Sequence, residues 1–129
     1  PRPHMGEKTF RVLAALRELA AETDDAPPTD EIATRGAVSI GVAERELNTL
    51  DAIGAAEELD ADGERFRPTD MSVEDVARRV DTLEALDSDE WSALRTALRR
   101  GDVAPADVLY DVHDARDAAD RAAGSEFAG

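Results

Sequence analysis

The sequence predicts a mainly α-helical protein with one small β-hairpin, in which an N-terminal domain is followed by an extension of about three helices. Apolar residues recur at steps of three and four along most of the chain, the spacing of one face of an α-helix. Around residues 55–68 this spacing gives way to short alternating runs, which indicates paired strands. With 129 residues, the chain is long enough to bury a core without disulfides.

The N-terminal region predicts a first helix over residues 7–22. Its apolar residues stand at helical spacing: Phe10, Val12, Leu13, Leu16, Leu19 and Ala20. Pro27 and Pro28 stop this helix, because consecutive prolines cannot continue it. Capping by Thr29 and Asp30 then favours a short helix ending at residue 35, with Ile32 and Ala33 facing inward.

A tight connection follows, in which Gly36 is expected to take the positive φ of a helix end. Ser39 is the expected N-cap of a third helix that runs to about Ile53. Its inward face is predicted from the spacing of Ala43, Leu47, Leu50 and Gly54.

The expected hairpin lies beyond Gly54. Asp62 and Gly63 form a strong hairpin-turn signal. Phe66 stands between two arginines, and this alternation of polar and apolar residues is typical of a strand with one buried face. Pro68 ends that strand.

Residues 71–123 predict the C-terminal helical region. One helix opens with a capping box at Ser72, and a second is capped by Asp87 and ends at Gly101. Pro105 lies near the first turn of a last helix, whose expected apolar face comprises Val108, Val112, Ala115, Ala119 and Ala122. The first of these helices has apolar residues at steps of three, four and three, the seam of a short coiled coil and the expected dimer interface: Val73, Val76, Val80 and Leu83.

The charge balance is strongly acidic, with 30 Asp and Glu against 15 Lys and Arg and a net charge of −15. Lys8 is the single lysine, and the acids are spread through the apolar pattern rather than gathered in a tail. This composition resembles that of proteins from extremely halophilic archaea. Self-repulsion would destabilise such a chain in dilute buffer, whereas at 1 M salt the screening length shrinks to about 3 Å. An ordinary acidic bacterial protein is the alternative.

Other features bound the protein's class and location. The absence of cysteine excludes disulfides and thiolate zinc sites. No apolar run reaches the roughly 20 residues of a membrane span, and no signal peptide is recognisable, so we expect a cytoplasmic protein without membrane contact. Residues 1–4 and 124–129 read as cloning remnants, which places the native chain between Met5 and about Ala123.

Residues 38–54 carry a family resemblance, in the run VSIGVAERELNTLDAIG. This run resembles the recognition helix of winged helix-turn-helix transcriptional regulators, and the resemblance continues through a wing at residues 60–69, DADGERFRPT. It covers residues 7–69 and implies a winged helix-turn-helix domain over that range. The C-terminal half resembles no family that we can name.

The resemblance implies binding to double-stranded DNA, with the third helix in the major groove. The groove-facing positions would be Ser39, Gly41, Glu44, Arg45 and Asn48, of which Arg45 suits guanine and Asn48 adenine. Phosphate contacts would come from Arg35, Arg65 and Arg67. The chain departs from the family pattern in placing acids on or beside this face, at Glu44, Glu46 and Asp51. We therefore expect a homodimeric regulator that relies on base contacts and shape at high salt, where phosphate-dominated binding is weak.

Two other interpretations remain open for this region. Arg65 and Arg67 would be solvated residues if they only balance Glu57 and Glu58 on the facing strand. The domain would then be a protein-interaction adaptor in a transcription, replication or RNA-processing assembly, which the acidic third helix favours. Sensing of a small ligand by the C-terminal helices is a third possibility.

Chemical sites are not expected. Residues 60–64 lack the further ligands of a calcium loop, and a hairpin turn explains them better. His113 and Asp117 have metal-ligand spacing, but such pairs arise by chance in so acidic a chain. Trp91 and Tyr110 are expected to pack in a core or a dimer interface. No catalytic constellation or cofactor motif is present, so we expect neither an enzyme nor a bound cofactor.

Overall fold

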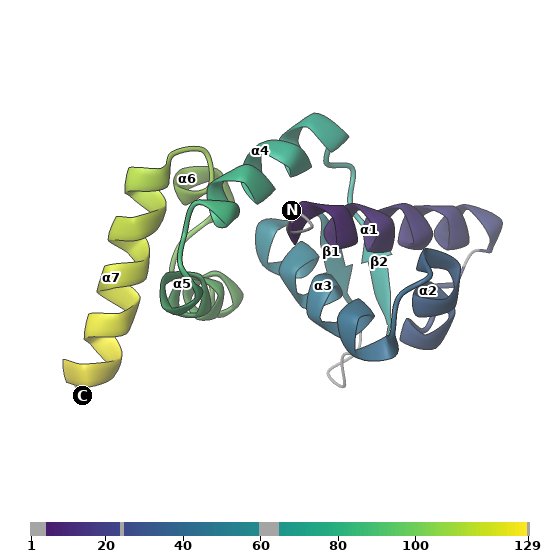
Figure 1. Ribbon diagram of the computed structural model, residues 1–129, viewed down its shortest axis with the longest axis horizontal. Coiled ribbons are helices and arrows are strands. Elements are labelled where there is room, and N and C mark those ends of the chain that lie inside the picture. The colour runs from purple at the N-terminus through teal and green to yellow at the C-terminus, as the bar shows by residue number, and fades with distance from the viewer. Residues whose placement is uncertain (1–4, 24, 60–64, 129) are drawn as a thin grey trace. The chain divides into compact units, whose positions relative to one another are not determined.

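The computed structural model describes the backbone of residues 5–23, 25–59 and 65–128, and the side chains of residues 7–23, 25–59 and 65–123. In this part of the chain it contains seven helices and one two-stranded antiparallel sheet (Figure 1). The prediction of a mainly helical protein with a small hairpin is confirmed. The chain divides into two compact units, unit 1 over Pro1–Met71 and unit 2 over Ser72–Gly129.

Unit 1 begins with three helices: α1 (Met5–Glu22), α2 (Thr29–Gly36) and α3 (Ile40–Ile53). Each of the three contacts the other two (Figure 1). Their apolar stripes meet in a core whose fully buried members include Val12, Leu13, Leu16, Ile32, Leu47, Leu50 and Ile53. The inward faces predicted from helical spacing are therefore confirmed for all three helices.

The two ends of α3 have the local chemistry predicted for them. The Oγ of Ser39 accepts a hydrogen bond from the backbone N–H of Val42 at 3.2 Å, so Ser39 is the N-cap. Gly54 closes the helix with φ 89°, a left-handed conformation that glycine adopts without steric cost. These two residues fix the length of α3 and the point at which the chain turns toward the hairpin.

The two ends of α2 differ from the sequence prediction. Pro28 occupies the N-cap position without a side-chain cap, and Thr29 is the first helical residue. The left-handed residue at the other end is Ala37, with φ 57°, while Gly36 stays helical. A Cβ on Gly36 would lie 3.4 Å from the backbone oxygen of Arg11. The positive φ predicted for Gly36 is therefore wrong, and a side chain there would be in ordinary contact with α1.

The hairpin consists of β1 (Ala56–Glu58) and β2 (Phe66–Pro68), paired antiparallel with Glu57 opposite Arg67. Phe66 is 1% exposed, and β2 contacts α1, so the hairpin covers the core with one face. The alternation predicted around Phe66 is confirmed. The turn predicted at residues 62 and 63 lies outside the described residues.

Unit 2 contains α4 (Val73–Glu84), α5 (Ser88–Arg100), α6 (Pro105–Val108) and α7 (Val112–Ala128). Helix α5 lies against α7, and Ala97, Ala115, Ala118 and Ala119 are buried in this unit. The predicted single last helix is wrong, because the chain breaks it between α6 and α7. Asp111 starts a new helix there: its Oδ1 accepts from the backbone N–H of His113 at 2.7 Å.

The helix ends of unit 2 follow local signals. Ser72 caps α4 by accepting from the backbone N–H of Asp75, and Asp87 and Glu90 form a complete capping box on α5. Gly101 ends α5 with φ 79°. All of these helix ends were predicted from the sequence. A complete capping box was also predicted at Ser72, and the hydrogen bond given there is the one that the Oγ of Ser72 accepts.

Two packing predictions for unit 2 need correction. Of the expected dimer seam, Val76, Val80 and Leu83 are at most 2% exposed, and only Val73 is at the surface, so the four residues do not form one exposed stripe. Tyr110 is 43% exposed and so does not pack in a core, while its packing in a dimer interface stays a prediction; the guanidinium of Arg79 lies 5.2 Å from its ring centroid. Trp91 is half-buried beside Arg95.

Candidate nucleic-acid interface

The outer face of α3 gathers four of the eight residues predicted to contact DNA. Gly41, Glu44, Arg45 and Asn48 stand at steps of three and four, so their side chains share one side of the helix. Glu44 and Arg45 are exposed, Asn48 is half-buried, and a Cβ at Gly41 would meet nothing within 4 Å. Ile40, at the start of α3, is 53% exposed. Its spacing, three residues before Ala43 and seven before Leu47, would place it with the buried face, and its exposure was not predicted.

Glu46 does not lie on this face, contrary to the sequence prediction. Its residue is 4% exposed, and its Oε1 accepts a hydrogen bond from the hydroxyl of Thr9 on α1. The sequence does contain a signal for this burial: Glu46 stands three residues after Ala43 and four before Leu50, which are both buried. One of the three acids expected beside the interface is therefore turned inward against α1.

Arg45 is held by the same carboxylate. Its Nε donates to Oε2 of Glu46 at 3.3 Å, while its side chain stays 59% exposed. Ser39, the other polar residue predicted at the start of this face, uses its Oγ to cap α3. The charged residues on this side of α3 are thus Arg45 and Glu44, which are exposed, and Asp51, which is half-buried.

The two hairpin arginines have partners within unit 1. Arg67 donates from Nη2 to Oε2 of Glu57 at 3.1 Å, and both side chains are more than half exposed. Arg65 donates from Nη1 to the backbone oxygen of Ala26. The Arg67 contact is the cross-strand pairing that the alternative interpretation of the hairpin predicted.

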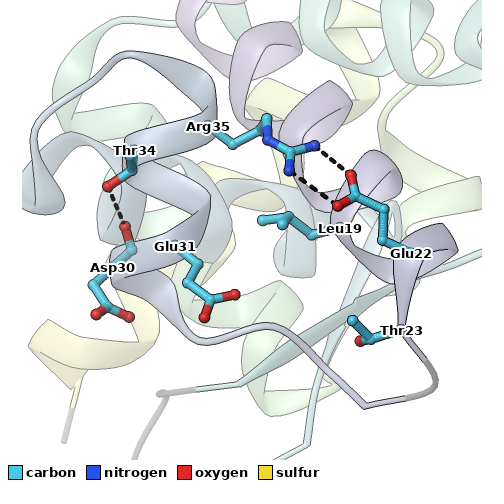
Figure 2. A pocket seen from close by; sticks show the side chains of 7 residues that line it. All are labelled: Leu19, Glu22, Thr23, Asp30, Glu31, Thr34 and Arg35. Carbon is cyan, nitrogen blue, oxygen red and sulfur yellow. Dashed lines mark hydrogen bonds and ion pairs between the residues drawn. The ribbon is translucent and has the colours of Figure 1, made fainter.

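Arg35 lies away from α3, in a hollow between the end of α1 and α2 (Figure 2). Two of its nitrogens donate to the carboxylate of Glu22 on α1, at 2.5 and 3.1 Å, and Glu18 lies 3.7 Å away. The hydrogen bond from Arg35 holds the pKa of Glu22 below its ordinary value, and the same bond raises the pKa of Arg35. Leu19 and Thr34 complete the walls of the hollow, which contains acids and one arginine.

The described part of the chain shows no other chemical centre. No group of three His, Asp or Glu side chains among these residues is placed to hold a metal ion. None of the helices in the described ranges has both the length and the apolar character needed to cross a membrane. Comparison of the chain with protein-family models, with curated proteins and with solved structures found no significant match.

Proposed function

We propose that unit 1 is a winged helix-turn-helix domain and that the protein is a cytoplasmic, homodimeric DNA-binding regulator of transcription, of the type found in halophilic archaea. The element order supports this: three mutually packed helices are followed directly by a two-stranded hairpin. In this fold the third helix enters the major groove and the hairpin lies along the backbone.

The observation that carries the proposal is the outer face of α3. Its leucines are fully buried, and its other side offers an arginine and an amide three residues apart, at Arg45 and Asn48. Gly41 leaves room beside them for a close approach of the groove wall. Burial of Glu46 turns its carboxylate toward Thr9 and Arg45 and leaves Glu44 and Asp51 as the acids on this side of α3.

High salt allows this face to work in so acidic a protein. Exposed ion pairs such as Arg67 with Glu57 contribute little and are weakened further by molar salt. Arg67 can then exchange its carboxylate for a DNA phosphate at little cost. Counterion release contributes little under the same conditions, so base contacts from Arg45 and Asn48 would carry the binding.

A protein-interaction adaptor is the second candidate. It is favoured by the partners of the arginines expected at phosphates, since Arg35 and Arg67 contact carboxylates and Arg65 contacts a backbone oxygen. The exposed Ile40 also suits an apolar protein contact. An adaptor of this kind would use the same face of α3 and bind no particular DNA sequence.

Selection of bound fragments from a genomic library in molar KCl tests the proposal. The wild type should enrich one short sequence with two-fold symmetry, and light scattering should give the mass of a dimer. Arg67→Ala should weaken binding to all fragments alike, because phosphate contacts carry no sequence information. Arg11→Ala is the matched control: Arg11 is also exposed and also contacts one carboxylate, that of Glu7 at 3.3 Å on α1, and its loss should leave binding unchanged.

Failure of the wild type to enrich any sequence would reject DNA recognition in favour of the adaptor. A monomer mass with a single enriched half-site would retain DNA binding and reject the homodimer.

A further inference from the structure

The structure links α1 to Arg45 through a buried carboxylate. Thr9 on α1 is 1% exposed and donates its hydroxyl hydrogen to Oε1 of Glu46, and the Nε of Arg45 donates to the other oxygen, Oε2. A carboxylate that is 4% exposed is costly unless hydrogen bonds and an opposite charge compensate it. Thr9 and Arg45 supply both, so each oxygen of Glu46 has a fixed partner.

Attachment through Nε leaves the terminal end of the guanidinium available. Among the residues that the structure describes, Arg45 makes no hydrogen bond through its two Nη groups, and its side chain is 59% exposed. The two Nη groups form a fork that matches paired acceptors, such as O6 and N7 of guanine. An exposed arginine loses much of its entropy when it binds; one already held at Nε loses less.

We propose that Thr9 and Glu46 act as positioning residues that fix Arg45, and that Arg45 so held sets a preference for guanine at one position of the DNA site. This inference rests on the proposed function. It assigns a role in recognition to Thr9, a buried residue on a helix that does not enter the groove in the proposed binding mode. It also explains why a glutamate lies on the buried side of α3.

The first test uses the free protein and needs no DNA. In ¹⁵N NMR spectra recorded in molar KCl, the Nε–H signal of Arg45 should exchange slowly with water. The Nε–H of Arg11 is the matched reference, because Arg11 contacts Glu7 through Nη2 and not through Nε. Glu46→Gln places an amide N–H₂ or a weaker acceptor opposite Arg45 and should abolish the slow exchange.

The second test measures base preference at the guanine position in the selected DNA. Arg45→Ala should remove the preference, by about tenfold or more. Glu46→Gln and Thr9→Val should reduce it several-fold while overall affinity changes less, and Thr9→Ser, which keeps the hydroxyl, should restore it. Circular dichroism of each variant establishes that it is folded, and Thr9→Val serves as the milder change should Glu46→Gln fail to fold.

The outcomes separate this inference from the proposed function. A wild type that selects a sequence, with Thr9→Val and Glu46→Gln keeping the full guanine preference, would reject the positioning role and retain DNA binding. Equal exchange rates for the Nε–H of Arg45 and Arg11 would reject the fixed arginine. A slow Arg45 signal in a protein that selects no sequence would reject the proposed function together with the role in recognition.

Discussion

Units 1 and 2 are both built from short helices, yet they fill their interiors differently. Of the twelve largest side chains that are fully buried in the described part of the chain, eight lie in unit 1 and four in unit 2. Phe66 is the largest of them and belongs to unit 1. In unit 2, alanines line the buried side of α7, and the helix ends carry more side-chain caps.

This difference indicates where the stability of each unit resides. Burial of a large apolar side chain contributes more than burial of an alanine methyl, because the gain follows the apolar area removed from water. Unit 1 should therefore be most sensitive to loss of core volume. Unit 2 has half as many of these large buried side chains, so loss of a cap at a helix end should remove a larger share of its stability.

The largest effect is expected for Phe66→Ala in unit 1. Removing a fully buried aromatic ring leaves a cavity and should lower the free energy of unfolding by about 3–5 kcal/mol. Chemical denaturation in molar KCl, followed by far-ultraviolet circular dichroism, measures it. Phe10→Ala is the matched control, because Phe10 is half-buried on α1 and should cost clearly less.

The fluorescence of Trp91, followed in the same denaturation experiment, tests whether the two units unfold separately. Trp91 is the single tryptophan and lies in unit 2, so its fluorescence follows that unit alone. If the units differ as inferred, Phe66→Ala should shift the transition seen by circular dichroism more than the transition seen by fluorescence. Identical shifts by both probes would mean that the chain unfolds as one cooperative unit, and the two regions should not then be compared separately.

An intermediate effect is expected for Asp87→Ala in unit 2. This change removes the side-chain acceptor that caps the backbone N–H of Glu90 and should cost about 1 kcal/mol. Trp91, in the first turns of the same helix, reports the loss by fluorescence. Asp89→Ala removes the same charge from the same turn without removing the cap, and a loss as large as that of Asp87→Ala would contradict the capping role.

Features set by local chemistry were predictable from the sequence. Ser39, Gly54, Asp87 and Gly101 cap or end helices through contacts with residues no more than five positions away, and all four were identified. The split between α6 and α7 was missed, although Asp111 is a favoured N-cap residue. The apolar residues keep their helical spacing across the break between α6 and α7, which favoured the prediction of one helix over the cap signal at Asp111. Such spacing continues when two successive helices bury the same side.

The remaining features depend on contacts between distant parts of the chain. The spacing of Glu46 from Ala43 and Leu50 places it on the buried side of α3, but the hydrogen-bond donor that satisfies it there comes from Thr9, 37 positions earlier. The sequence identified the arginines expected to contact phosphates by their charge and position. Their carboxylate and backbone partners could not be predicted, because these contacts follow from tertiary packing.

The smallest effect is expected for Glu22→Gln, which tests an exposed ion pair instead of a buried side chain or a helix cap. Arg35 holds the pKa of Glu22 below its ordinary value of 4.5 through their hydrogen bond. Because the pKa is lower in the folded than in the unfolded chain, this pair stabilises the fold above pH 4.5, and the contribution is lost as the pH falls through the lowered value. Glu22→Gln should therefore destabilise unit 1 slightly at neutral pH and remove part of the acid-induced loss of stability below pH 4.5.

Glu31→Gln is the control, since Glu31 lines the same hollow without contacting Arg35 in the interactions that the structure gives (Figure 2). Denaturation as a function of pH in molar KCl measures both variants. Because both partners are exposed and salt screens them, a loss at neutral pH as large as that of Asp87→Ala would show that exposed ion pairs stabilise unit 1 as strongly as caps stabilise unit 2.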